Sequence, residues 1–274
     1  MPFPTVPRKH TFPSAYQPTA FLDALREQGW APGPVPESVV FTYAHFEHHL
    51  AAHPELYTPN DMLGTGPGRF FLVNATDGRV GVNCLGIGAP AAVAQLEMQA
   101  ELGVRRCVSI GTAGGLHVRQ EPGDIVLVTS AVRDEGTSYH YLPADAPAVP
   151  DAALTTQFGT ALDAAGLAHA EGPTVTTDAP FRTTPEEIRW HRANGVCAAE
   201  MEAAAIFALG QVRDLPVSSA VVLDSVPDDS GTAFRIGNRR AGEVLRALLA
   251  ATIDFLAELA GLVALGERGG LFGA

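Results

Sequence analysis

From residue 39 onward, short apolar runs alternate with longer segments whose apolar residues recur at helical spacing. The short runs have the length and β-branched content of buried strands, and the longer segments are typical of helices packed on a sheet. This alternation predicts a single α/β domain with a buried sheet. The expected strands are 39–43, 69–75, 80–85, 107–110, 125–132 and 217–223. The expected helices are 19–28, 46–53, 91–102, 184–194, 198–209 and 245–262.

Two local patterns specify how these elements connect. The strand at 80–85, a glycine turn, the helix at 91–102 and the strand at 107–110 form a βαβ pattern, which implies parallel pairing. Asp77-Gly78 lies between two apolar runs and predicts a hairpin. We divide the chain into a proline-rich arm (1–38) that lies over the body or a neighbouring subunit, a domain (39–262) and a tail (263–274).

Composition excludes several classes of function. The formal charge of −12 disfavours DNA or RNA as a partner, because an acidic surface repels a phosphate backbone. The three cysteines have no CxxC spacing, which disfavours both a disulfide framework and a metal site. The segment 245–262 is amphipathic, and no apolar run follows the basic residues near the N-terminus. We therefore expect a cytoplasmic protein that neither binds nor crosses a membrane.

A glycine-rich turn, Gly86-Ile87-Gly88-Ala89-Pro90-Ala91, follows one expected strand and precedes a helix. The pattern is similar to a dinucleotide fingerprint, which also needs an acidic residue at the end of the next strand. The next strand ends in Ser109-Ile110-Gly111 and has no carboxylate there. The sequence therefore predicts a glycine turn that opens a helix and no bound dinucleotide.

The run Ser109-Ile110-Gly111-Thr112-Ala113-Gly114-Gly115 contains small residues and a hydroxyl directly after an apolar strand. Such a run is either a tight turn or an exposed row of backbone amides at the carboxyl edge of the sheet, where α/β proteins bind ligands. It has more small residues than a turn needs. We therefore favour an anion or ribose site.

Three other segments contain residues that could contact a ligand. Glu200 and Glu202 flank Met201 at the start of an expected apolar helix, where they either suit the helix dipole or, if buried, accept sugar hydroxyls. Asp224 stands at the end of an expected apolar strand, where it is either a helix or loop cap or a general acid. In the loop 176–182, Phe181 can stack on a base and Arg182 can pair with an anion.

Four segments together resemble the purine and uridine phosphorylase family, which includes nucleoside phosphorylases and related nucleosidases. The resemblance covers about residues 38–260, and its most specific segments are 86–90, 102–116, 122–138 and 198–209. It implies a phosphorylase/hydrolase-like α/β fold, in which helices flank a central mixed and partly barrel-like sheet. It also implies a homo-oligomer (a dimer or a hexamer) and phosphate as a co-substrate, with no cofactor and no metal.

The resemblance also assigns roles to individual residues. The ribose hydroxyls are expected to contact Met201 and Glu202, with Glu200 close by, and the base is expected beside Phe181. Asp224 matches the aspartate that purine-cleaving members use to protonate the leaving base. His10 matches a histidine that is lent to a neighbouring subunit. Phosphate is expected at Gly111 and Thr112, with Arg182, Arg69 and Arg106 as candidate cations.

The chain departs from the family in its phosphate-binding segments. Phosphorylases carry a G-D-P-x-R loop after the first strand, where this chain has Phe41-Thr42-Tyr43-Ala44. Phosphorylases also carry an arginine where this chain has Ser109. The nucleosidases, which use water, lack this arginine as well. The nucleosidases in turn have an early glutamate that activates water, and this chain shows none.

Three functions are consistent with these motifs. The first is a phosphorylase that cleaves a purine nucleoside or uridine, the second is a nucleosidase, and the third is a non-catalytic nucleoside-binding relative. Asp224 favours a purine base, whereas overall similarity favours the uridine branch.

Overall fold

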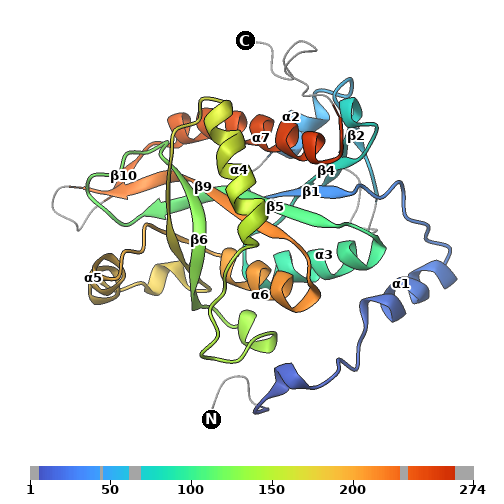
Figure 1. Cartoon of the computed structure of the whole chain (residues 1–274), viewed down its shortest axis with the longest axis horizontal. Coiled ribbons are helices and arrows are strands. Elements are labelled where there is room, and N and C mark those ends of the chain that lie inside the picture. Colours follow the sequence, from blue (N-terminus) through green and yellow to red (C-terminus); the bar gives the residue numbers. More distant parts are fainter. Residues whose placement is uncertain (1–5, 44–45, 62–68, 229–233, 263–274) are drawn as a thin grey trace.

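The computed structural model describes residues 6–43, 46–61, 69–228 and 234–262. Within these residues ten strands form one sheet, in the order β10-β9-β6-β7-β8-β5-β1-β4-β3-β2, and seven α-helices surround it (Figure 1). The strands are β1 Ser38–Thr42, β2 Tyr57–Pro59, β3 Phe70–Val73, β4 Val80–Cys84, β5 Arg106–Gly115, β6 Ile125–Asp134, β7 His169–Thr177, β8 Ala198–Glu200, β9 Val217–Pro227 and β10 Phe234–Ile236. The helices are α1 Pro18–Glu27, α2 Glu47–Ala51, α3 Ala89–Leu102, α4 Ala152–Ala164, α5 Pro185–Ala193, α6 Ala203–Arg213 and α7 Asn238–Leu259.

Part of the sheet closes into a barrel. Strand β9 pairs with β6 on one side and with β5 on the other, so β5, β9, β6, β7 and β8 form a closed ring. The pairing is mixed, because β5–β9, β6–β7 and β7–β8 are parallel while β6–β9 and β5–β8 are antiparallel. The expected mixed and partly barrel-like α/β sheet is thus confirmed.

Helices cover both faces of the sheet and give the protein two main hydrophobic cores. Helices α3 and α6 pack on one face, where residues such as Leu96 and Phe207 are completely buried. Helices α2, α4 and α7 pack on the other face through residues such as Phe158 and Leu256. In Figure 1, α2 and α7 lie on one side of the strands and α3 and α6 on the other.

The predicted βαβ unit and hairpin are present. Strands β4 and β5 both pair in parallel with β1, and α3 connects them. Strands β3 and β4 are antiparallel. A short 3-10 turn at Asn74–Thr76 lengthens their connection beyond two residues, and Asp77 and Gly78 then adopt positive φ angles of 51° and 72°. Gly88 precedes α3 with a φ of 109°, a conformation that favours glycine.

The strand expected at 107–110 is longer in the structure, because the small-residue run Gly111–Gly115 belongs to it and is not the tight turn that was the alternative. Strand β5 continues to Gly115 because β9 pairs with it along the whole run, from Cys107–Val217 to Gly114–Ser225. Residues without bulky side chains fit here because the backbone and side chains of neighbouring elements come close. A Cβ atom on Gly115 would lie 2.9 Å from a Val226 methyl group.

The segment 198–209 was predicted to be one helix, and this prediction is wrong at its start. Ala198–Glu200 is strand β8, and helix α6 begins only at Ala203. Pairing with both β5 and β7 overrides the helical propensity of this alanine-rich segment. The change of direction occurs at Met201 and Glu202, so the two glutamates belong to different elements.

Asp224 does not end its strand, which corrects a third expectation. Strand β9 continues to Pro227 and pairs with β10. The register with β5 shifts by one residue at this point, because Ala113 pairs with Leu223 while Gly114 pairs with Ser225. Asp224 is therefore the extra residue of a β-bulge, a feature that redirects a side chain within a sheet.

The N-terminal arm lies outside the sheet and contacts the body at a few points. Helix α1 packs beside α3, where the Thr19 hydroxyl donates a hydrogen bond to Glu101 at 2.7 Å. Lys9 contacts His140 at 2.7 Å. The arm nevertheless leaves apolar side chains in solvent, since Tyr16 is 92% exposed. The predicted tail (263–274) lies outside the described residues.

Candidate functional site

Strand β5 has a short gap along one edge. On that edge β1 pairs with β5 as far as Ile110, and β8 pairs with it only from Gly114. The backbone between them, Gly111–Ala113, therefore has no neighbouring strand on that side. The gap adjoins the carboxyl ends of β1 and β4, where open α/β sheets bind ligands.

Glu202 approaches this region from the start of helix α6. Its side chain is 6% exposed. The backbone N–H of Gly88, at the start of α3, donates a hydrogen bond to Oε1 of Glu202. The backbone N–H of Met201 also interacts with this carboxylate. An ionised carboxylate can accept about four hydrogen bonds, so these two backbone donors leave acceptor capacity for a ligand. A buried carboxylate with unused acceptor capacity is costly unless a partner supplies hydrogen bonds.

Glu200 is also buried, but its carboxylate is fully used within the protein. Its Oε2 accepts hydrogen bonds from the N–H groups of Glu202 and Ala203, both at 2.7 Å. Its Oε1 accepts from the hydroxyls of Thr176 and, at 3.4 Å, Thr174. Glu200 thus caps the first turn of α6 and ties it to β7. Of the two glutamates, Glu202 has fewer donors within the protein and is the one with acceptor capacity left for a sugar.

Burial raises the pKa values of both carboxyl groups. Loss of water raises the pKa of Glu202 to about 8, and the neighbouring Glu200 adds to the rise, while the Gly88 N–H opposes it. Burial also raises the pKa of Glu200, against the hydrogen bonds from Thr176, Ala203 and Glu202. Displaced pKa values of this kind are common in functional sites.

Tyr43 connects the gap with the carboxylate, and the sequence motifs did not single it out as a site residue. It follows β1 directly, and the Ser109 hydroxyl donates a hydrogen bond to its phenol oxygen at 3.2 Å. Its ring lies against Gly111, where a Cβ atom would be 3.1 Å from Tyr43 Cδ2. Burial raises the pKa of Tyr43, and the charge of Glu202 raises it further.

Asp224, the candidate general acid, lies one strand away from the gap. As the bulge residue of β9 it stands beside Ala113 and Gly114 of β5. It is half-buried, and the Ser225 hydroxyl donates a hydrogen bond to its Oδ1 at 2.9 Å. The strand pairing thus places Asp224 near the carboxyl end of the run that contains Gly111 and Thr112.

The structure does not bring Phe181 and Arg182 against the other site residues. Both lie in a short 3-10 turn between β7 and α5, and the Phe181 side chain is fully exposed. The Arg182 side chain is exposed too, and it forms no hydrogen bond or ion pair with any described residue. A role for either residue in ligand binding therefore requires movement of this turn or a second subunit.

Five further candidate residues remain to be placed relative to the gap. Met201 is half-buried between β8 and α6, and Thr112 is exposed in the gap. Arg106 begins β5, about 17 Å along the strand from Gly111, and its guanidinium donates to the Ser38 hydroxyl at 3.4 Å. Arg106 is therefore not a phosphate ligand at the gap. Arg69 and His10 contact none of these site residues through a described hydrogen bond or ion pair.

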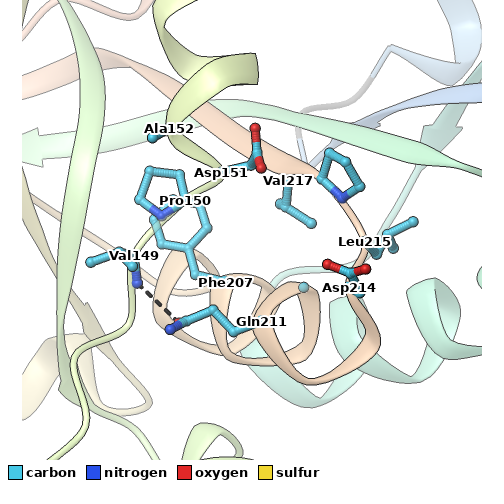
Figure 2. A pocket seen from close by; sticks show the side chains of 11 residues that line it. Val149, Pro150, Asp151, Ala152, Phe207, Gln211, Asp214, Leu215 and Val217 are labelled. Carbon is cyan, nitrogen blue, oxygen red and sulfur yellow. Dashed lines mark hydrogen bonds between the residues drawn. The ribbon is translucent and has the colours of Figure 1, made fainter.

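A separate cavity of about 230 Å³ lies at the other end of β9 (Figure 2). Phe207, Gln211, Asp151 and Asp214 contribute to its walls, and the Val149 N–H donates a hydrogen bond to Gln211 at 3.2 Å. Its wall residue Val217 precedes Asp224 by seven residues, or about 23 Å along the strand. This cavity is therefore distinct from the candidate site.

Comparison with known proteins gives the family. Residues 43–254 match the model of the phosphorylase superfamily. Over 141 residues the chain is 39% identical to a guanosine phosphorylase of Halorubrum lacusprofundi, a match that covers 51% of this chain and 58% of that protein. Over 155 residues it is 33% identical to a uridine phosphorylase of Treponema pallidum, covering 53% and 60%. The chain thus spans little more than half the length of these two curated relatives.

Solved structures share the fold at low identity. A purine nucleoside phosphorylase from Toxoplasma gondii superposes with a TM-score of 0.70 at 19% identity, over 82% of this chain and 92% of that one. An AMP nucleosidase from Bacteroides thetaiotaomicron superposes with a TM-score of 0.62 at 20% identity, over 83% and 90%. The family model covers most of the chain and the fold agrees with it, so the protein belongs to the phosphorylase superfamily.

Proposed function

We propose that this protein cleaves the N-glycosidic bond of a purine nucleoside or uridine, with phosphate as the acceptor. The products would be the free base and (deoxy)ribose 1-phosphate. The names of the relatives support this class of reaction, since they include a guanosine phosphorylase and a uridine phosphorylase. The reaction needs phosphate as a co-substrate and uses no cofactor or metal.

The buried Glu202 carboxylate carries the proposal. Beyond the backbone N–H groups of Gly88 and Met201, the carboxylate can accept the 2′ and 3′ hydroxyls of a ribose, and these hydroxyls would replace the water lost on burial. Cleavage gives the sugar oxocarbenium character, and an ionised carboxylate beside the sugar stabilises the developing positive charge. The pKa of about 8 means that the group is protonated in the empty site at neutral pH and ionises when sugar hydroxyls donate to it.

The other residues take complementary roles in this proposal. Phosphate would lie at the unpaired edge of β5, where Gly111 and Thr112 offer backbone groups and a hydroxyl. Asp224 would donate a proton to the leaving base, a contribution of about 10²–10⁴-fold in rate. Phe181 would stack on the base, and Arg182 would approach the phosphate if the turn that carries them moves towards the site.

Hydrolysis is the second candidate, and one observation favours it. A hydroxyl pair, Ser109 and Tyr43, stands at the edge of the gap where a phosphate-binding cation was expected. The charged groups that shift the pKa of Tyr43 include Glu202 and Glu200, both acidic. When they are ionised, these acidic neighbours weaken the binding of a phosphate dianion, whereas water carries no charge for them to repel.

Base release from a nucleoside panel distinguishes the two reactions. We would incubate purified protein with purine and pyrimidine nucleosides, with and without phosphate, and measure the free base. The proposal predicts release that requires phosphate. Equal release without phosphate would identify a nucleosidase, and binding without release would identify a non-catalytic relative.

The assembly and location of the protein are also proposals. We propose a homo-oligomer, a dimer or a hexamer, because the arm leaves Phe12, Tyr16 and Phe21 more than half exposed. We further propose a cytoplasmic protein that acts on small molecules and not on nucleic acid, given its net charge of −12. Among the described helices, none is long and apolar enough to span a membrane.

A further inference from the structure

The hydroxyl of Tyr43 is placed to act on a ligand. The Ser109 hydroxyl donates to the phenol oxygen at 3.2 Å, so this bond does not use the phenol's own proton. No described residue accepts a hydrogen bond from the Tyr43 O–H. Ser109 itself is 3% exposed and cannot turn towards solvent, so the pair holds the phenol in one orientation.

Two neighbours fix the position of the Tyr43 ring, namely strand β1 and Gly111. Its backbone continues β1 by one residue, beside Gly111 in the register that pairs Thr42 with Ile110. The ring lies against Gly111, the first residue of the unpaired edge. The Glu202 carboxylate lies within electrostatic range of the phenol and raises its pKa. Tyr43 thus lies at the edge where the acceptor would bind.

The surrounding groups determine what Tyr43 can bind. Burial raises the pKa of Tyr43, and the charges of Glu202 and Glu200 raise it further, so Tyr43 remains a neutral donor at all physiological pH values. A neutral O–H that lacks an acceptor is a good partner for an anionic oxygen, and such bonds are stronger than bonds between two neutral groups. Phosphate oxygens have this chemistry, and the backbone N–H groups of an open strand edge are suited to the same anion.

We propose that Tyr43 is a nucleophile-binding residue, which holds phosphate at the Gly111 edge through its hydroxyl while Ser109 orients it. The inference rests on the proposed phosphorolysis. It assigns phosphate binding to neutral hydroxyl and amide donors, in place of the arginine expected from the family pattern.

The test compares Tyr43→Phe and Ser109→Ala with the wild type and with Tyr57→Phe. Tyr57 is the matched control, because it is a completely buried tyrosine whose hydroxyl has no partner and which lies in β2, at the far edge of the sheet. Two quantities are measured for each protein: the KM for phosphate in base release, and the rise in Tm that saturating inorganic phosphate produces. The second readout needs no catalysis.

For Tyr43→Phe we expect a ten- to hundredfold higher KM for phosphate, a KM for nucleoside within about twofold of wild type, and loss of most of the phosphate-induced rise in Tm. Ser109→Ala should give a smaller change in the same direction, and Tyr57→Phe none. If the wild type depends on phosphate and folded Tyr43→Phe keeps the wild-type KM for phosphate, the role of Tyr43 is overturned while phosphorolysis stands. If the wild type ignores phosphate in both assays, phosphorolysis itself fails, and the inference fails with it.

Discussion

Replacing Glu202 with glutamine should stabilise the folded protein at neutral and alkaline pH while it impairs activity. The substitution keeps the size of the side chain and an oxygen that can accept from the Gly88 N–H. It removes the negative charge that burial and Glu200 make unfavourable. A residue that lowers stability but is needed for activity is typical of a functional site.

The magnitude follows from the pKa of Glu202. A rise from 4.5 to about 8 corresponds to roughly 5 kcal/mol when the group is ionised in both states, at about 1.4 kcal/mol per pKa unit. Because the folded-state pKa is raised, the group costs nothing below pH 4.5, where it is protonated in both states. The cost grows as the pH rises towards 8, reaches about 3 kcal/mol at pH 7 and is constant above the folded-state pKa.

The assay is urea unfolding of the wild type and Glu202→Gln at pH 5, 7 and 9. We expect similar free energies of unfolding near pH 5, a gain of about 3 kcal/mol for the variant at pH 7 and a larger gain at pH 9. Glu243→Gln, which alters an exposed glutamate on α7, serves as the control and should show no such trend. A difference between Glu202→Gln and wild type that does not change with pH would refute the reasoning.

Three further predictions follow from the same contacts. The affinity for nucleoside should increase up to about tenfold per pH unit between pH 6 and 8, because sugar hydroxyls bind the ionised form of Glu202. Calorimetry without phosphate measures this affinity, and an affinity that does not change with pH would contradict the prediction. Glu200→Ala should lower the free energy of unfolding by about 2–4 kcal/mol, because it leaves two amides of α6 and two threonine hydroxyls without their acceptor. The exposed Glu186→Ala, its control, should change it by less than about 0.5 kcal/mol, and equal losses would show that Glu200 is not a cap. Phe181→Ala should leave the free energy of unfolding within about 0.5 kcal/mol of wild type, because the ring is fully exposed. If the ring stacks on the base, the same variant should raise the KM for nucleoside about tenfold. An unchanged KM would remove Phe181 from the site.

The sequence predicted those parts of the fold that depend on local pattern. Apolar runs located β1, β4, β6 and β9, and the glycine turn before α3 was correctly interpreted as the opening of a helix. The wrong predictions of secondary structure share one physical cause, namely pairing between strands that are distant in the sequence. By composition Gly111–Gly115 could be a turn, but pairing with β9 makes it part of a strand. Ala198–Glu200 has a helical composition, but pairing with β5 and β7 makes it a strand.

The candidate site was predictable as a set of residue types but not as an arrangement. The sequence identified both glutamates as buried carboxylates that need partners. It could not show that Thr176 and the start of α6 satisfy Glu200, which leaves Glu202 as the ligand-binding candidate. Tyr43 carried no signal of its own, because its contact with Ser109 joins residues 66 positions apart.

The central claim, phosphorolysis of a nucleoside, is tested most directly by following phosphorus during turnover. We would supply the protein with phosphate and the nucleoside that it cleaves best, then record ³¹P NMR spectra alongside the amount of free base. The account predicts a new phosphate ester signal that grows in proportion to the base released. Release of base while the spectrum retains inorganic phosphate alone would show that water is the acceptor and would contradict the account.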